Sequence, residues 1–186
     1  MASHWKICSD NELIAAMRRQ GENSRHAFEE LYRRYADRVY AYCLRVLGNE
    51  EEARDVFQEA FYRFYRTCRT DGDRSTAGLL ITVARNLCLN SKRDRKHMVP
   101  VEEWHVVALG SPYEQKELLT LISSALELLD FPLREAFVLR QYQQFSYSEM
   151  SEITGESVDV LKNRVWRAKE KLKELLSPIL EDLSQL

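Results

Sequence analysis

The sequence predicts an all-α protein made of two small helical domains joined by a flexible acidic linker, with a helix-turn-helix in the second domain. Apolar residues recur every three or four positions in several long segments, which is the spacing of one helix face. Only six glycines and four prolines occur in 186 residues, which argues against a fold of many short strands and turns. This length, with 45% hydrophobic residues, suits one large domain or two small ones.

The first predicted domain spans residues 24–96 and follows an N-terminal extension, residues 1–23. Its first helix covers residues 25–47, with an inner face of Phe28, Leu31, Tyr35, Val39, Cys43 and Val46. Gly48 is expected to end this helix and Asn49 to cap the next one, whose first turn holds three glutamates. The inner face of that second helix is Ala53, Val56, Phe57, Ala60, Phe61 and Phe64. After the break "RTDGDRS", a third helix buries Leu80, Val83, Ala84, Leu87 and Cys88.

The linker is predicted at residues 97–110, where the apolar periodicity fades. The second domain, residues 111–186, opens with Ser111, Pro112 and Glu114, which is a typical helix start. Its first helix runs to about residue 129, and another helix begins near Pro132.

The strongest local signal is "SYSEMSEITGES". Ser146 and Glu149 fit a capping box, Gly155 closes a short helix, and Ser157 can cap the longer helix that follows. A short helix, a tight turn and a longer helix form a helix-turn-helix. The outer face of the longer helix mixes cations with an asparagine and a tryptophan, as DNA-reading helices do: Lys162, Asn163, Trp166, Arg167, Lys169 and Lys173. The alternative is a solvated basic helix that only keeps the protein soluble.

The charge distribution favours a polyanionic partner although the whole chain has a net charge of −2. Residues 24–96 have a net charge of +4, residues 97–156 of −7, and residues 157–186 of +1. Two basic segments therefore flank an acidic middle, as expected when separate surfaces meet a polyanion.

Several classes of function find no support in the sequence. It contains no phosphate-binding glycine loop, zinc-protease motif or nucleophile elbow, so we predict no catalytic residue and no cofactor. The four cysteines are widely spaced, and His4 with Cys8 would supply only two metal ligands, so we predict no metal site. With no signal peptide and no long apolar run, we expect a cytoplasmic protein without membrane insertion.

Four motifs in order resemble the extracytoplasmic-function sigma factors, the small promoter-recognition subunits of bacterial RNA polymerase. The first is the spacing of Ala53, Asp55, Gln58 and Phe61, and the second is "VARN" followed by "KRDRK". The third is "FSYSEMS" in the helix-turn-helix, and the fourth is "RAKEKL" in the basic helix. The resemblance covers about residues 24–176.

The resemblance implies a role for each domain. The first domain would bind the clamp helices of the largest polymerase subunit through Asp55, Gln58 and Glu59. It would open the −10 element with residues of its third helix and the preceding loop, which captures a flipped base: Gly72, Asp73, Arg85, Asn86, Asn90, Arg93 and Arg95. The second domain would bind the flap of the second-largest subunit and read the −35 element with Ser157, Lys162, Asn163, Arg164, Trp166 and Arg167. The acidic linker would run through the RNA path of the polymerase.

Two departures from the family pattern affect DNA recognition. Leu79 and Leu80 stand where the family usually has Trp-Leu, and Gly78 before them is expected to loosen the helix start. Asp159 and Val160 replace a usual Gly-Thr at the start of the reading helix, so a phosphate-binding hydroxyl is missing. Asp159 could repel phosphate or accept a hydrogen bond from cytosine N4.

The predicted function is therefore a sigma factor that binds core RNA polymerase, recognises promoter DNA and assists its melting. An anti-sigma factor is a further candidate partner. Two rival hypotheses are a stand-alone helix-turn-helix regulator, which would bind an operator tightly without polymerase, and a helical adaptor protein.

Overall fold

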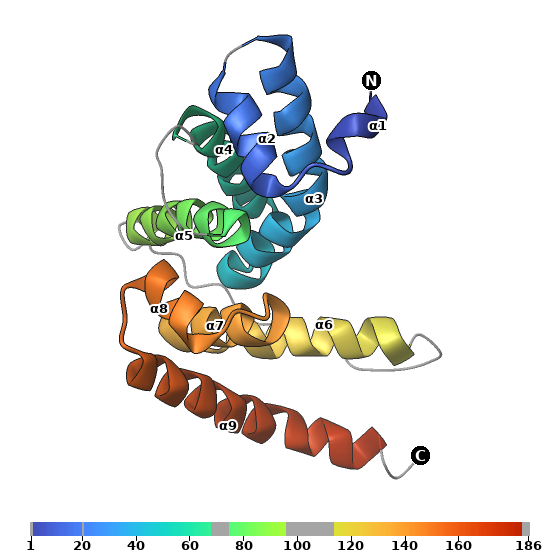
Figure 1. The fold of residues 1–186 in the computed structure, drawn as a ribbon. Helices are drawn as coiled ribbons and strands as arrows, with labels where there is room; N and C mark the ends of the chain where they lie inside the picture. The colour runs from blue at the N-terminus through green and yellow to red at the C-terminus, as the bar shows by residue number, and fades with distance from the viewer. Residues whose placement is uncertain (1, 20, 68–74, 96–113, 184–186) are drawn as a thin grey trace. The chain divides into compact units, whose positions relative to one another are not determined.

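The computed structural model describes residues 2–19, 21–67, 75–95 and 114–183, and all its regular elements in these ranges are helices (Figure 1). The chain divides into two compact units, Met1–Asn90 and Ser91–Leu186, so that the division falls within the last turns of a helix. The predicted linker, residues 97–110, lies outside the described residues. The all-helical fold class is confirmed.

In its described residues the first unit contains α1 (Ala2–Trp5), α2 (Asp10–Arg18), α3 (Glu22–Leu47), α4 (Glu50–Thr67) and most of α5 (Thr76–Arg95). The sequence signals at the α3–α4 turn are confirmed. Gly48 ends α3 in the left-handed conformation, with φ of 73° and its N–H bonded to the Leu44 carbonyl. Asn49 caps α4, because its Oδ1 accepts a hydrogen bond of 2.9 Å from the Glu52 N–H. This tight turn lets α3 and α4 pack against each other.

Each long helix of the first unit buries large apolar side chains. The fully buried ones include Leu13 of α2, Leu31 and Tyr42 of α3, Phe64 of α4 and Leu80 of α5. The predicted core residues Cys43 and Cys88 are both fully buried. Burying these apolar side chains is the main stabilising contribution to such a unit, at about 1.5–3 kcal/mol for each large one.

The N-terminal segment packs on this core. Arg34 of α3 donates from Nη2 to the carbonyls of Trp5, Lys6 and Cys8 at 3.3, 3.1 and 2.8 Å. Its Nη1 donates to Asp10 Oδ1 at 2.9 Å. The guanidinium therefore fixes the loop between α1 and α2, so the predicted extension, residues 1–23, contains a helix that shares the core of the first unit.

The second unit contains α6 (Glu114–Glu127), α7 (Phe131–Phe137), the π-helical turn η1 (Val138–Tyr142), α8 (Tyr147–Thr154) and α9 (Val158–Leu183). One core cluster gathers Ala125, Leu126 and Leu129 with Leu133, Ala168 and Leu172. Met150 and Leu161 are also fully buried, so α8 is held against α9.

The turn η1 was not predicted from the sequence. The Gln143 N–H bonds to the Val138 carbonyl at 3.0 Å, five residues back, and the Phe145 N–H bonds to the Leu139 carbonyl at 3.1 Å. Gln144 then takes a positive φ of 57°. This widened turn brings the chain to the start of α8, where Arg140 Nη1 donates to the Phe145 carbonyl at 2.9 Å.

Candidate nucleic-acid interface

The turn between α8 and α9 has the predicted helix-turn-helix geometry. Ser146 and Glu149 form the capping box, with Ser146 N–H donating to Glu149 Oε2 at 2.8 Å and Glu149 N–H donating to Ser146 Oγ at 3.2 Å. Gly155 ends α8 in the left-handed conformation with φ of 76°. Ser157 Oγ accepts from the Val160 N–H at 3.4 Å and so caps α9. These local bonds set the path of the chain into α9.

The helix α9 buries one stripe and exposes another. Leu161, Val165, Ala168 and Leu172 are buried, as predicted. On the opposite side Asp159, Lys162, Asn163 and Arg167 are exposed, and Trp166 is 61% exposed. An exposed tryptophan among cations and an asparagine is a surface suited to contact bases and phosphates.

Two of the residues predicted to contact DNA instead make contacts at the start of α9. Arg164 is only 24% exposed, and its Nη2 lies 2.8 Å from Glu156 Oε1 in the preceding turn. Ser157 uses its hydroxyl at the helix start. Both residues therefore support the start of α9, whereas the other four predicted residues lie on its exposed face.

The predicted −10 residues lie on α5 where the structure describes them. Asn86, Asn90 and Arg93 are exposed and follow each other at helical spacing, while Arg85 is half-buried. Gly72 and Asp73 lie outside the described residues. Arg95 is the last residue of α5, but the structure does not describe its side chain.

The start of α5 is capped despite Gly78. The Gly78 N–H donates to Ser75 Oγ at 3.1 Å, and a Cβ at position 78 would come within 3.0 Å of that oxygen. The serine hydroxyl therefore supplies a side-chain cap at this helix start, and the loosening expected from Gly78 stays a prediction.

A second surface lies between α3 and α4. Asp55 and Gln58 are exposed on α4, and Glu59 is half-buried and paired with Arg63, its Oε1 lying 2.6 Å from Arg63 Nε. Gln58 also stands at the edge of a pocket of about 460 Å³. The three predicted polymerase contacts thus lie on one helix beside a cavity.

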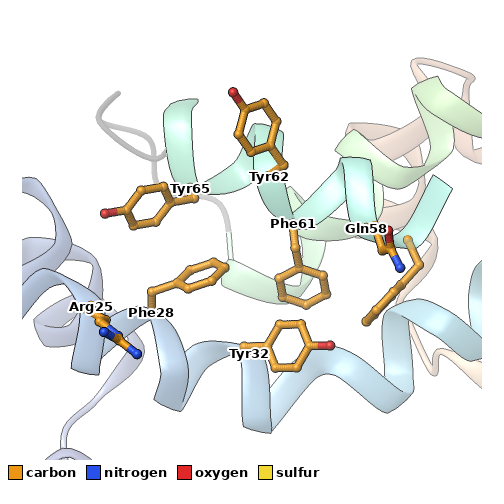
Figure 2. A pocket seen from close by; sticks show the side chains of 8 residues that line it. Arg25, Phe28, Tyr32, Gln58, Phe61, Tyr62 and Tyr65 are labelled. Carbon is orange, nitrogen blue, oxygen red and sulfur yellow. The ribbon is translucent and has the colours of Figure 1, made fainter. Parts of the chain in front are cut away.

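The pocket is lined mainly by aromatic rings. Helical periodicity in the sequence placed Phe28, Phe57 and Phe61 on inner helix faces but did not single out the three tyrosines, Tyr32, Tyr62 and Tyr65. Figure 2 shows Phe28 and Tyr32 of α3 facing Phe61 and Tyr65 of α4, with Gln58 and Arg25 at opposite ends. The ring centroids of Phe28 and Tyr65 are 4.9 Å apart, and those of Tyr32 and Phe61 are 4.8 Å apart. The sequence signal that could have indicated this pocket is the pair of aromatic-rich segments "FYRFY" and "LYRRY". Exposed aromatic rings around a cavity are typical of protein-binding surfaces.

No metal centre is formed by the part of the chain that the structure describes. His4 Nε2 lies 3.7 Å from Cys8 Sγ, but no group of three potential ligands occurs among the described residues. None of the described helices is long and apolar enough to cross a bilayer.

Comparison with known proteins decides the family. The Sigma-70 region 2 model matches residues 31–98, and the Sigma-70 region 4 model matches residues 119–172. The ECF RNA polymerase sigma factor SigW of Bacillus subtilis is 30% identical over 166 residues, which cover 81% of this chain and 89% of SigW. The chain belongs to the ECF sigma factors. SigE of Mycolicibacterium smegmatis, another ECF sigma factor, is 28% identical, and the match covers 86% of this chain but only 65% of SigE.

Two solved structures share this fold. CnrH, in complex with the cytosolic domain of CnrY, is 25% identical with a TM-score of 0.68, covering 91% of this chain and 97% of CnrH. RpoE of Bartonella quintana, in complex with the anti-sigma factor NepR, is 24% identical with a TM-score of 0.68, covering 81% of this chain and 96% of RpoE.

Proposed function

We propose that this ECF sigma factor binds core RNA polymerase, directs it to promoters through −10 and −35 elements, and assists promoter melting. The observation that carries the proposal is the presence of both sigma regions in one chain, each with an exposed polar face where the resemblance requires one. Acting with polymerase on DNA, the protein would work in the cytoplasm.

The −35 contact is assigned to the exposed face of α9. Lys162 and Arg167 can donate hydrogen bonds to phosphate or guanine, and Asn163 can pair with adenine. The exposed ring of Trp166 can make apolar contacts in the groove. Charge-assisted contacts from a few cations bring affinity, while the asparagine brings sequence preference. The −10 contact is assigned to α5, where Asn86, Asn90 and Arg93 line one exposed face.

The polymerase contact is assigned to Asp55 and Gln58 together with the neighbouring aromatic pocket. An exposed carboxylate and amide beside partly exposed rings resemble the polar rim and apolar centre of protein interfaces. The ring of Tyr62, which is 56% exposed with Arg66 5.6 Å from its centre, extends this surface.

Run-off transcription with purified core polymerase on genomic fragments tests the function. Promoter-specific initiation and co-elution with core are expected, and their joint absence would refute the proposal. Tight operator binding without polymerase would favour a stand-alone regulator instead.

A charge-reversed pair of variants tests the polymerase surface. Asp55→Arg should weaken co-elution with core at least tenfold, because reversing the charge at the rim of the interface places like charges opposite each other. Asp37→Arg is the matched control, because Asp37 is exposed on α3 and lies nine residues, about 180° around the helix, from the pocket residue Phe28. Equal binding by both variants would remove Asp55 from the interface.

An anti-sigma factor is proposed as a second partner. RpoE of Bartonella quintana was solved with the anti-sigma factor NepR, and CnrH was solved with the cytosolic domain of CnrY. This chain shares the fold of both proteins. Affinity purification of the tagged chain from its own cells should recover a protein that competes with core polymerase. Recovery of polymerase alone under all growth conditions would contradict this partner.

A further inference from the structure

The exposed face of α9 is ordered around its axis. With about 100° between successive residues, Asp159, Asn163 and Trp166 fall within an arc of about 60° opposite the buried stripe. Lys162 and Arg167 lie on either side of this arc. In a helix lying in the major groove, the central line faces the base edges and the flanks face the two phosphate backbones.

Asp159 is available for a contact on this central line. Its side chain is 95% exposed in the first turn of α9, the part of a recognition helix that approaches base edges. Lys162 Nζ lies 3.9 Å from its Oδ1, which is an ion pair too long for a hydrogen bond. Both carboxylate oxygens thus remain able to accept, while the nearby ammonium reduces repulsion from DNA.

The chemistry of a carboxylate selects among bases. An ionised Asp only accepts hydrogen bonds. In the major groove cytosine presents the N4 amino donor, whereas guanine presents two acceptors and thymine presents O4 and a methyl group. Adenine offers a donor beside an acceptor, which a carboxylate matches less well than an amide does.

We propose that Asp159 is a specificity-determining residue that selects a C·G pair in the DNA element read by α9, by accepting a hydrogen bond from cytosine N4. This inference rests on the proposed function of α9 in promoter recognition. In this proposal the Asp159 carboxylate contacts a base edge, and not the phosphates on either side of the groove.

A selection experiment tests the assignment. Core polymerase with the full chain selects from a promoter library randomised over the −35 region, and the bound DNA is sequenced. The wild type should favour C·G at one position, roughly 5- to 100-fold over T·A. Asp159→Ala should lose that preference and keep the others, and Asp159→Asn should shift it toward adenine.

Glu170→Gln supplies the matched control. Glu170 is exposed on the same arc but lies eleven residues along the helix, about 16 Å from Asp159, and its substitution removes the same charge. It should leave every base preference unchanged. If Asp159→Ala binds all sequences more tightly without altering any base preference, the carboxylate acts on phosphates and the inference is overturned. If the wild type selects no element at all, the proposed function fails together with the inference.

Discussion

Replacing Glu30 by glutamine should destabilise the first unit by about 2 kcal/mol at neutral pH. Glu30 is only 6% exposed, and its carboxylate accepts from Arg33 Nη2 at 2.6 Å and from Arg34 Nε at 2.8 Å. These contacts, led by the hydrogen bonds from Arg33, lower the pKa of Glu30 from 4.5 to about 2. A glutamine would keep the shape but bring its amide group toward two cationic donors.

The magnitude follows from the pKa. A lowering from 4.5 to about 2 corresponds to about 3 kcal/mol of stability at neutral pH. Arg33 is 61% exposed, so water and salt screen its part, and about 2 kcal/mol is the expected effect. Because the folded pKa is depressed, this stability is complete above pH 4.5 and is lost as the pH falls toward 2.

The assay is urea unfolding of the full chain, read by pulsed hydrogen exchange on peptides from α2, α3 and α4. This readout separates the first unit from the second. The difference between wild type and Glu30→Gln should shrink by more than half between pH 7 and pH 3. Glu29→Gln is the control, since Glu29 is half exposed beside Arg25 and should change little. A difference of the same size at pH 7 and pH 3 would refute the ion-pair explanation.

Three further outcomes test other parts of the structure. Gly155→Ala should lower the stability of the second unit by about 1–2 kcal/mol. The φ of 76° is strained for any residue with a Cβ, although no atom lies within 4 Å of the added carbon. Unchanged hydrogen exchange of α8 and α9 peptides in urea would contradict this. Ser146→Ala should lower the stability of the second unit by about 1 kcal/mol, because the capping box is lost. Ser148 is exposed, so Ser148→Ala should leave the stability nearly unchanged. Equal thermal unfolding of the two variants would contradict a stabilising role of the cap. Burial and the hydrogen bond to Asp10 raise the pKa of Tyr35 from 10.0 to about 12, so the free energy of unfolding should fall as the pH rises from 10 toward 12. Tyr35→Phe should make this fall less steep in urea titrations at several pH values. Parallel plots of stability against pH for the two proteins would exclude Tyr35 as the cause.

The sequence predicted those features whose causes are local. Gly48, Asn49 and the capping box of Ser146 and Glu149 act within four residues, and each has the predicted role. The inner and outer stripes of α9 follow from helical periodicity alone, which is why the exposure of Trp166 could be predicted.

Features that depend on distant partners could not be predicted in this way. The packing of α2 rests on Leu13 and Met17, a stripe too short to signal burial, and on Arg34, which is 24 residues beyond Asp10. The position of Arg164 depends on Glu156, outside its own helix. The turn η1 has no apolar period that distinguishes it from an α-helix. The aromatic pocket requires knowledge of how α3 and α4 face each other.

The contacts of Arg34 also constrain how this chain can change through evolution. Its Nη2 recognises the main-chain oxygens of Trp5, Lys6 and Cys8, which any amino acid would supply. The side chains at these positions are therefore free to drift without loss of the hydrogen bonds, while the backbone path and the arginine must persist together. Among descendants of this gene, we expect an invariant arginine facing a segment of varied sequence but constant length.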